Sequence, residues 1–292
     1  LPPGQEDYAR NTDDFTKRLL AQGGETDLPA DSYALIVDGL VETPLALDLN
    51  TIKSYPRVEH YATLSCVSNP VGGDLIGTTL FQGIRLGDLL SQAGIKSEAQ
   101  KLKFTCVDGY SESLPIPLAN DPSTLLCYSM GNQSLTQNHG APIRHYTAGR
   151  YGMKSPKWII NIEAINDDYQ GYWQQQGWSD EAEVKTTAVI DTILPNQNGL
   201  STLGGIAYAG IRGINSVELQ ANDSAWIPAI INRPLSPFTW ILWRAELNIP
   251  PGESTVMVRA IDGDGNPQIE EASAPHPDGA SGYHSIKVKL DA

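Results

Sequence analysis

The sequence has few cysteines and no long apolar run, and both shortages limit the classes to which it can belong. Its 292 residues contain only three cysteines, at Cys66, Cys106 and Cys127. So sparse and odd a set cannot build the disulfide framework of a small secreted domain, and no Cys-x-x-Cys pair is present for a structural zinc ion. No apolar stretch approaches the roughly 18 residues that a membrane-spanning helix requires.

Basic residues are scarce as well. Lys and Arg together number 20 against 34 Asp and Glu, which gives a formal net charge of −14. Nucleic acids and anionic membranes are bound through clustered cations. We therefore expect no nucleic-acid partner.

Several catalytic signatures are missing. Neither a Gly-x-x-x-x-Gly-Lys-Ser/Thr loop nor a Gly-x-Gly-x-x-Gly fingerprint occurs, and no His belongs to a His-Glu-x-x-His motif. The five His residues are scattered along the chain: His60, His139, His145, His276 and His284. The sequence thus offers no sign of a P-loop, a dinucleotide-binding domain or a zinc hydrolase.

The most informative shortage is a gap in the acidic residues. The 41 residues between Asp121 and Glu163 contain no Asp or Glu, although the overall composition predicts about five there. Such a gap in an acidic protein is typical of a pocket for an anionic ligand, because a nearby carboxylate would oppose binding. A chance gap on a solvated face is the alternative. The cationic and imidazole side chains of this stretch are His139, Arg144, His145, Arg150, Lys154 and Lys157.

Two parts of this acid-free stretch suit a phosphate group. The segment 150–158 (RYGMKSPKW) has a Gly that permits close backbone approach, and one hydroxyl and two ammonium groups that can converge on an anion. His139 precedes a Gly-Ala-Pro turn, where it could face a ligand. Arg144 and His145 are neighbours on a predicted strand, so at most one of them faces a given pocket.

Cys66 stands where a predicted strand enters a loop containing Gly and Pro, residues 68–73. A thiolate there could be a soft metal ligand or a nucleophile. Taken alone, it could equally be a small buried hydrophobe. Cys106 and Cys127 lie among apolar residues of predicted strands, and we assign both to the core.

Periodicity and turn signals predict two domains. Short helices at about 44–52 and 84–93 among many strands predict an α+β first domain, residues 1–165, with 1–30 as an irregular arm. Residues 166–198 are predicted to be a connecting segment. Closely spaced strands separated by polar turns predict an immunoglobulin-like sandwich over residues 199–292. The predicted strands are 32–41, 58–66, 101–107, 124–130, 143–147, 158–165, 206–209, 215–221, 227–231, 239–247, 255–261 and 283–289.

At these positions the sequence resembles the sulfite oxidase superfamily of molybdopterin enzymes. Residues 63–69 (TLSCVSN) are similar to the segment that supplies the molybdenum-ligating Cys, and 109–115 (GYSESLP) to the strand end that carries an active-site Tyr. Residues 139–144 (HGAPIR) resemble the His-Gly-x-Pro-x-Arg pterin-phosphate motif, and 154–158 (KSPKW) the Lys-Trp segment that follows it. Residues 205–268 resemble the family's immunoglobulin-like dimerisation domain. The motifs occur in family order.

The resemblance implies a molybdenum-molybdopterin cofactor, with Cys66 as the thiolate ligand of the metal and Tyr110 beside it, helping proton transfer. The implied chemistry is a two-electron redox reaction of a small-molecule substrate, usually with oxygen-atom transfer. No haem or flavin domain is visible, so electrons would pass through a separate partner, and the C-terminal domain would permit a homodimer. The residues implied to bind the cofactor are Cys66, Ser68, Asn69, His139, Arg144, Lys154, Ser155 and Lys157.

The substrate pocket departs from the family pattern. Sulfite oxidases carry an Arg five residues after the ligand Cys, where this chain has Val71, and only Arg10, Lys17 and Arg18 could replace others in the N-terminal arm. Each charge-assisted contact contributes roughly 1.5–3 kcal/mol to binding. Because such contacts to sulfite are missing here, we expect poor sulfite oxidation. A sulfoxide reductase of the same superfamily is the alternative, and a non-catalytic binding or adhesion protein is the alternative from another class.

The chain begins at Leu1 rather than Met. From this we expect that an upstream segment has been removed, which could have been a signal peptide or a membrane anchor. The relatives imply a periplasmic or other extracytoplasmic location.

Overall fold

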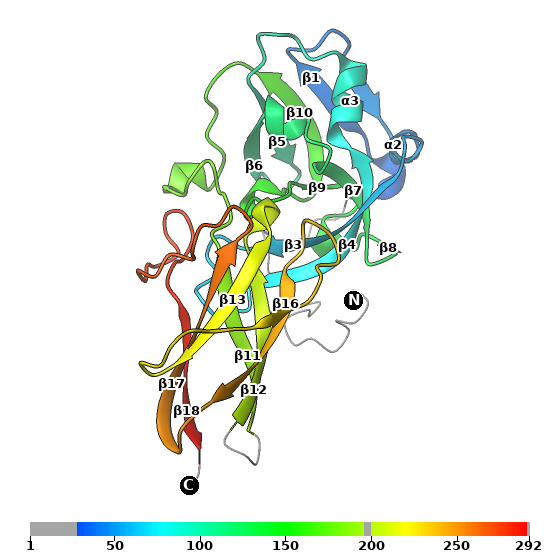
Figure 1. The fold of residues 1–292 in the computed structure, drawn as a ribbon. Coiled ribbons are helices and arrows are strands. Elements are labelled where there is room, and N and C mark those ends of the chain that lie inside the picture. The colour runs from blue at the N-terminus through cyan, green and yellow to red at the C-terminus, as the bar shows by residue number, and fades with distance from the viewer. Residues whose placement is uncertain (1–27, 196–199, 291–292) are drawn as a thin grey trace. The chain divides into compact units, whose positions relative to one another are not determined.

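A computed structural model describes residues 28–195 and 200–290. These residues form two compact units (Figure 1). The first comprises 28–66 and 75–182, and the second comprises 67–74 and 183–290. Arg10, Lys17 and Arg18, with nearly all of the expected arm 1–30, lie outside the described residues. No helix within the described ranges is long and apolar enough to cross a membrane.

The first unit contains two five-stranded sheets. One has the order β2-β1-β10-β5-β6, in which only the β1–β10 pair is parallel. The other has the order β3-β4-β7-β8, with β9 also paired to β7, and is antiparallel throughout. Their bounds are β1 Leu35–Gly39, β2 Leu45–Leu47, β3 Val58–Ser65, β4 Ile76–Arg85, β5 Lys101–Cys106, β6 Ser111–Pro115, β7 Leu125–Met130, β8 Gln133–Ser134, β9 Arg144–Tyr146 and β10 Ile159–Ile165.

The first unit has little helix. Its α-helices are α2 (Leu49–Lys53), α3 (Leu86–Ala93) and α4 (Ile116–Ala119), each of eight residues or fewer. The buried residues of α3 recur at helical spacing, and Gly94 at φ +69° ends it. The unit is therefore mostly β, with less helix than the α+β prediction. The predicted helix at about 44–52 is wrong in its first half, because 45–47 pair with β1 as strand β2 and the helix covers only 49–53. The helix predicted at 84–93 begins at Leu86, two residues later than predicted, because 84 and 85 complete β4.

The second unit consists of two four-stranded antiparallel sheets, β11-β12-β16-β15 and β14-β13-β17-β18. Every second residue of β16 and β17 is buried, and both sheets contribute to one apolar core. The bounds are β11 Thr187–Pro195, β12 Leu200–Tyr208, β13 Ile214–Ala221, β14 Ile227–Pro228, β15 Ile230–Ile231, β16 Ile241–Asn248, β17 Gly252–Asp262 and β18 His284–Leu290.

The predicted connecting segment 166–198 is divided between the two units. Residues up to Ala182 group with the first unit, where Tyr172 and Trp173 pack against its apolar core. Strand β11 belongs to the second unit, with Ala188 and Ile190 in its core. Tyr172 and Trp173, two aromatic residues of the predicted connecting segment, thus anchor its first part to the first unit. The loop 67–74 also groups with the second unit, although the sequence patterns place it in the first domain, residues 1–165.

Candidate cofactor site

A buried arginine that has no counterion among residues 28–195 and 200–290 is the centre of the candidate site. Strand β9 places Arg144 opposite Cys127 of β7, and 1% of the Arg144 surface is exposed. Its Nη1 donates to the carbonyl oxygen of His139 at 3.2 Å, whereas Nε and Nη2 have no partner within the described ranges. Its guanidinium carbon lies 5.6 Å from the centre of the Phe81 ring. Burial lowers the pKa of Arg144 to about 10. Unused donors on a buried cation indicate the position of an anion.

Lys157 supplies a second cation to the same place. It is 2% exposed, its Nζ donates to the carbonyl oxygen of Asn138 at 2.9 Å, and it lies 4.1 Å above the Trp158 ring. Burial, followed by the positive charge of Arg144, lowers the pKa of Lys157 to about 7. The two cations repel each other, and an anion bound between them would relieve that repulsion.

Gly140 brings these two cations together. It has φ +99°, and a Cβ atom there would lie 2.8 Å from the Cβ of Lys157 and 3.1 Å from that of Arg144. It follows a single 3₁₀ turn, Gln137–His139, in which His139 is 8% exposed. Only Gly permits both the conformation and the close approach. The two sequence segments that resemble pterin-phosphate motifs therefore meet at this residue.

Ser155 and His145 are two further buried residues of the acid-free stretch. The Ser155 hydroxyl is fully buried and accepts the backbone N–H of Thr147 at 3.2 Å. The His145 ring stacks on Phe104 at 4.7 Å, and burial lowers its pKa to about 3, so it is neutral. Arg144 and His145 thus contact different aromatic rings, as the strand alternation predicts.

Lys154 is hydrogen bonded to groups outside the acid-free stretch. Its Nζ donates to Glu112 at 2.9 Å, to Asp180 at 2.8 Å and to the carbonyl oxygen of Ser113 at 3.0 Å. Two carboxylates already neutralise this ammonium group, so it is a poor ligand for a phosphate. Lys154 thus belongs to a buried ion triad with Glu112 and Asp180, and its role in cofactor binding stays a prediction. The acid-free stretch gives no sign of the triad, because Glu112 lies in the segment that resembles a strand end and Asp180 lies in the predicted connecting segment.

Tyr110 lies beside this triad. It is 4% exposed, and its hydroxyl donates to the carbonyl oxygen of Met153 at 2.7 Å and to Glu112 Oε2 at 3.3 Å. Burial, followed by the charge of Glu112, raises the pKa of Tyr110 well above its usual value. The phenol is therefore neutral at physiological pH and can act as a hydrogen-bond donor or proton carrier.

Cys66 is the partly exposed member of the three cysteines. It directly follows β3, and its N–H donates to the carbonyl oxygen of Leu75 at 2.9 Å. Cys106 and Cys127 are buried, and burial raises the pKa of both thiols, that of Cys127 to about 12. The predicted cofactor residues Ser68 and Asn69 lie in the loop that groups with the second unit, so the unit that holds Cys66 does not contain them.

Strand β4 connects the thiol end of the site to the cationic end. Its first residue, Ile76, pairs with Ser65 next to Cys66, and Phe81 lies beneath Arg144. Five residues of strand correspond to roughly 16 Å. Within 28–195 and 200–290, no group of three His, Cys, Asp or Glu is placed to hold a metal ion. A single ligand that reached both Cys66 and Arg144 would therefore be elongated.

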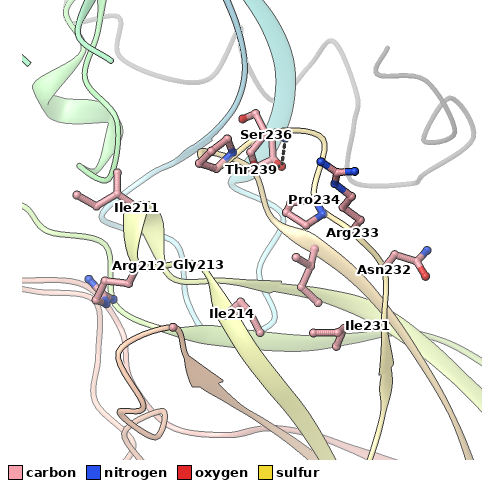
Figure 2. A pocket seen from close by; sticks show the side chains of 13 residues that line it. Ile211, Arg212, Gly213, Ile214, Ile231, Asn232, Arg233, Pro234, Ser236 and Thr239 are labelled. Carbon is pink, nitrogen blue, oxygen red and sulfur yellow. Dashed lines mark hydrogen bonds between the residues drawn. The ribbon is translucent and has the colours of Figure 1, made fainter. Parts of the chain in front are cut away.

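The pocket in Figure 2 has different chemistry. It has a volume of about 410 Å³ and lies entirely in the second unit, between residues 211 and 263. None of the predicted cofactor residues lines it. Its Arg212 is paired with Asp262 at 3.0 Å and with Glu183 at 2.7 Å. Its other cation, Arg233, is exposed, so the pocket lacks a buried cation like Arg144 or Lys157.

The first unit therefore combines a partly exposed cysteine at the end of β3 with a buried pair of cations beside Gly140. The sequence model of the oxidoreductase molybdopterin-binding domain matches residues 23–173, and the chain belongs to this family. It is an oxidoreductase of the sulfite oxidase superfamily, and its cofactor is the molybdenum cofactor. The superfamily prediction is confirmed.

Individual relatives agree with this assignment. The chain is 25% identical to sulfite oxidase from Arabidopsis thaliana over 83% of its own length and 78% of the relative. It is 31% identical to the uncharacterized oxidoreductase YuiH of Bacillus subtilis over 50% of its length and 72% of the relative. The sulfane dehydrogenase SoxCD from Paracoccus pantotrophus superposes with a TM-score of 0.79 at 19% identity, covering 94% of this chain and 83% of that one. The last similarity concerns the fold alone.

Proposed function

We propose that the protein catalyses two-electron oxygen-atom transfer to or from a small molecule and that it oxidises sulfite poorly. The observation that carries the site assignment is the buried guanidinium of Arg144, in which Nε and Nη2 have no partner among the described residues. It lies on the sheet whose strand β3 ends directly before the partly exposed Cys66. An apolar core needs neither a buried guanidinium nor a partly exposed thiol. An anionic cofactor that carries a metal would use the guanidinium for its anion and the thiol for its metal.

The residues present fit the molybdenum cofactor, which when bound supplies the redox-active metal. Cys66 would ligate that metal. Arg144 and Lys157 would neutralise the phosphate, in the space that Gly140 leaves open, with His139 and Ser155 around them. Tyr110 would donate or accept a proton near the reacting group. Ser68 and Asn69 remain predicted cofactor ligands.

The weakness toward sulfite rests on Val71, which stands where relatives of the sulfite oxidase type carry an Arg. A charge-assisted contact contributes roughly 1.5–3 kcal/mol, so Val71→Arg is expected to raise kcat/KM for sulfite by about tenfold or more. The matched control Val71→Leu is expected to leave it unchanged. No gain with Arg would show that the missing charge is not what limits sulfite oxidation.

Metal analysis tests the assignment directly. Protein made in a molybdopterin-competent host should carry molybdenum and release a fluorescent pterin, and an absence of both would refute the proposal. Steady-state assays then separate the alternatives. Oxidation of sulfite with ferricyanide and reduction of methionine sulfoxide with reduced viologen are compared on the same preparation. Turnover of the sulfoxide alone would favour the reductase alternative.

We further infer an immunoglobulin-like second unit. The orders β11-β12-β16-β15 and β14-β13-β17-β18 correspond to the ABED and C′CFG arrangement of such sandwiches, which supports this inference. A homodimer through this unit, a separate electron carrier and an extracytoplasmic location are part of the same proposal. Sedimentation, reduction of candidate carriers and cell fractionation, respectively, test them.

A further inference from the structure

The loop 67–74 is closed at its base beside Cys66. The backbone N–H of Cys66 donates to the carbonyl oxygen of Leu75 at 2.9 Å, so the two ends of the loop are held together. The loop itself groups with the second unit, as strand β18 does. Among the described residues, the apolar core of that unit includes no residue of the loop. The loop is therefore not needed to complete this core, and other contacts fix its position.

The tip of the loop is a tight turn, residues 70–73. The N–H of Gly73 donates to the carbonyl oxygen of Pro70 at 2.9 Å, and Gly72 has φ +78°. A hydrogen bond from the fourth residue to the first, with a positive φ at the third, is the pattern of a type II turn. Val71 is the second residue of this turn. The turn therefore sets the direction of the side chain at position 71, where sulfite oxidases carry an Arg.

The imidazole ring of His284 packs directly on this turn. A Cβ atom on Gly72 would lie 2.5 Å from Nε2 of His284 and closer still to Cδ2. Both the positive φ and this close approach require a glycine at position 72. Ring and turn belong to the same unit, although they are far apart along the chain. The turn therefore cannot shift toward β18 without displacing the ring.

A hydrogen bond fixes the ring on its other edge. Nδ1 of His284 accepts the backbone N–H of Ile190 at 3.0 Å. Ile190 belongs to β11, which is an edge strand of its sheet, and the ladder between β11 and β12 shifts register directly after it. A neutral imidazole that accepts at Nδ1 carries its proton on Nε2. His284 thus has two separable contacts: it accepts the N–H of an edge strand, and its ring holds the turn.

We propose that His284 is a positioning residue for substrate selection. By packing on Gly72 it fixes the turn 70–73, and through the turn it sets where the side chain at position 71 meets the substrate. This inference rests on the proposed function, in which the side chain at position 71 limits sulfite oxidation. It gives strand β18 a part in selecting the substrate, in addition to its place in the second unit's sheet.

Two substitutions separate the ring contact from the hydrogen bond. His284→Asn keeps an oxygen near the position of Nδ1 and removes the Nε2 edge, whereas His284→Phe keeps a ring and removes the acceptor. Backbone hydrogen exchange is followed by NMR in the purified full-length chain. His284→Asn should speed exchange at Gly73 by about tenfold or more, because the turn then opens more easily, and should leave Ile190 protected. His284→Phe should do the reverse. Unchanged exchange at Gly73 in His284→Asn would overturn the inference.

Sulfite kinetics show whether the turn acts on the substrate. In molybdenum-loaded Val71→Arg protein, adding His284→Asn should cancel most of the roughly tenfold gain in kcat/KM, through KM rather than kcat, while His284→Phe should keep it. The control Tyr283→Phe changes the neighbouring residue, which hydrogen bonds to Arg259, and should leave the gain intact.

The outcomes separate this inference from the proposed function. Should His284→Asn fail to fold, Gly72→Ala replaces it in both experiments with the same expected loss, because its Cβ would collide with the ring. A gain that persists with His284→Asn, or no gain from Val71→Arg, would overturn the inference and leave a molybdenum enzyme standing. Protein without molybdenum would refute the proposed function, and exchange at Gly73 would still decide whether His284 holds the turn.

Discussion

Replacing Arg144 by Met is expected to stabilise the cofactor-free protein while abolishing cofactor binding. Arg144 is 1% exposed, and two of its nitrogen atoms lack partners within the described part of the chain. Met keeps the apolar stem above Phe81 and removes the charge. In the cofactor-free protein this charge disfavours folding, whereas in the loaded protein it is the partner of the phosphate.

Two estimates of the magnitude agree. Burial lowers the pKa of Arg144 from 12.5 to about 10. Because the folded-state pKa is the lower one, the charged side chain disfavours folding at every pH below about 10, by about 3 kcal/mol. Independently, two unsatisfied buried donors at about 1–3 kcal/mol each give about 2–6 kcal/mol. We therefore expect a gain of about 3 kcal/mol, or roughly 6–12 °C in Tm.

The assay is urea unfolding of molybdenum-free protein, with molybdenum content measured on the same variants after loading. Arg259→Met serves as the control, because Arg259 is partly exposed and paired with Glu218 at 2.7 Å. It should lose no more than about 1 kcal/mol and keep its molybdenum. A clear loss of stability in cofactor-free Arg144→Met would refute the reasoning, since it would mean that the guanidinium is already satisfied without an anion.

The other predictions concern the same site. Because the pKa of Lys157 is about 7, sulfate bound beside it should draw a proton onto the cofactor-free protein: about 0.9 proton at pH 8 and about 0.1 at pH 6. Calorimetry in buffers of different ionisation enthalpy measures this uptake. Equal uptake at both pH values would show that Lys157 does not bind the anion. Because the pKa of Lys157 is lower in the folded than in the unfolded protein, the free energy of unfolding of the cofactor-free protein should rise with pH above about 7. Iodoacetamide should label Cys66 before the buried Cys106 and Cys127, and bound cofactor should protect it; labelling of Cys66 that molybdenum does not reduce would contradict its ligand role. Gly140→Ala should lose molybdenum, because its Cβ would meet Lys157 at 2.8 Å; full retention would show that the turn can shift.

Local patterns predicted much of the fold. Strand alternation, helical spacing around Leu86–Ala93 and the stop at Gly94 depend on neighbouring residues, so they can be read from one sequence. Strands β4, β6 and β11 are absent from the predicted strands because their residues do not stand out by alternation or composition. They are ordered by the sheets that they join, through pairing with β3, β5 and β12.

The kind of site could be predicted from the residues alone, because the acid-free stretch and the ordered motifs are properties of residue type and spacing. They indicated an anion site around Arg144 and Lys157 and a metal ligand at Cys66. That Lys154 contacts Glu112 and Asp180 is visible in the folded chain alone. These partners are 42 and 26 residues away along the chain. The direction of a long side chain depends on which charges the folded chain places within reach, and spacing along the chain carries no record of that.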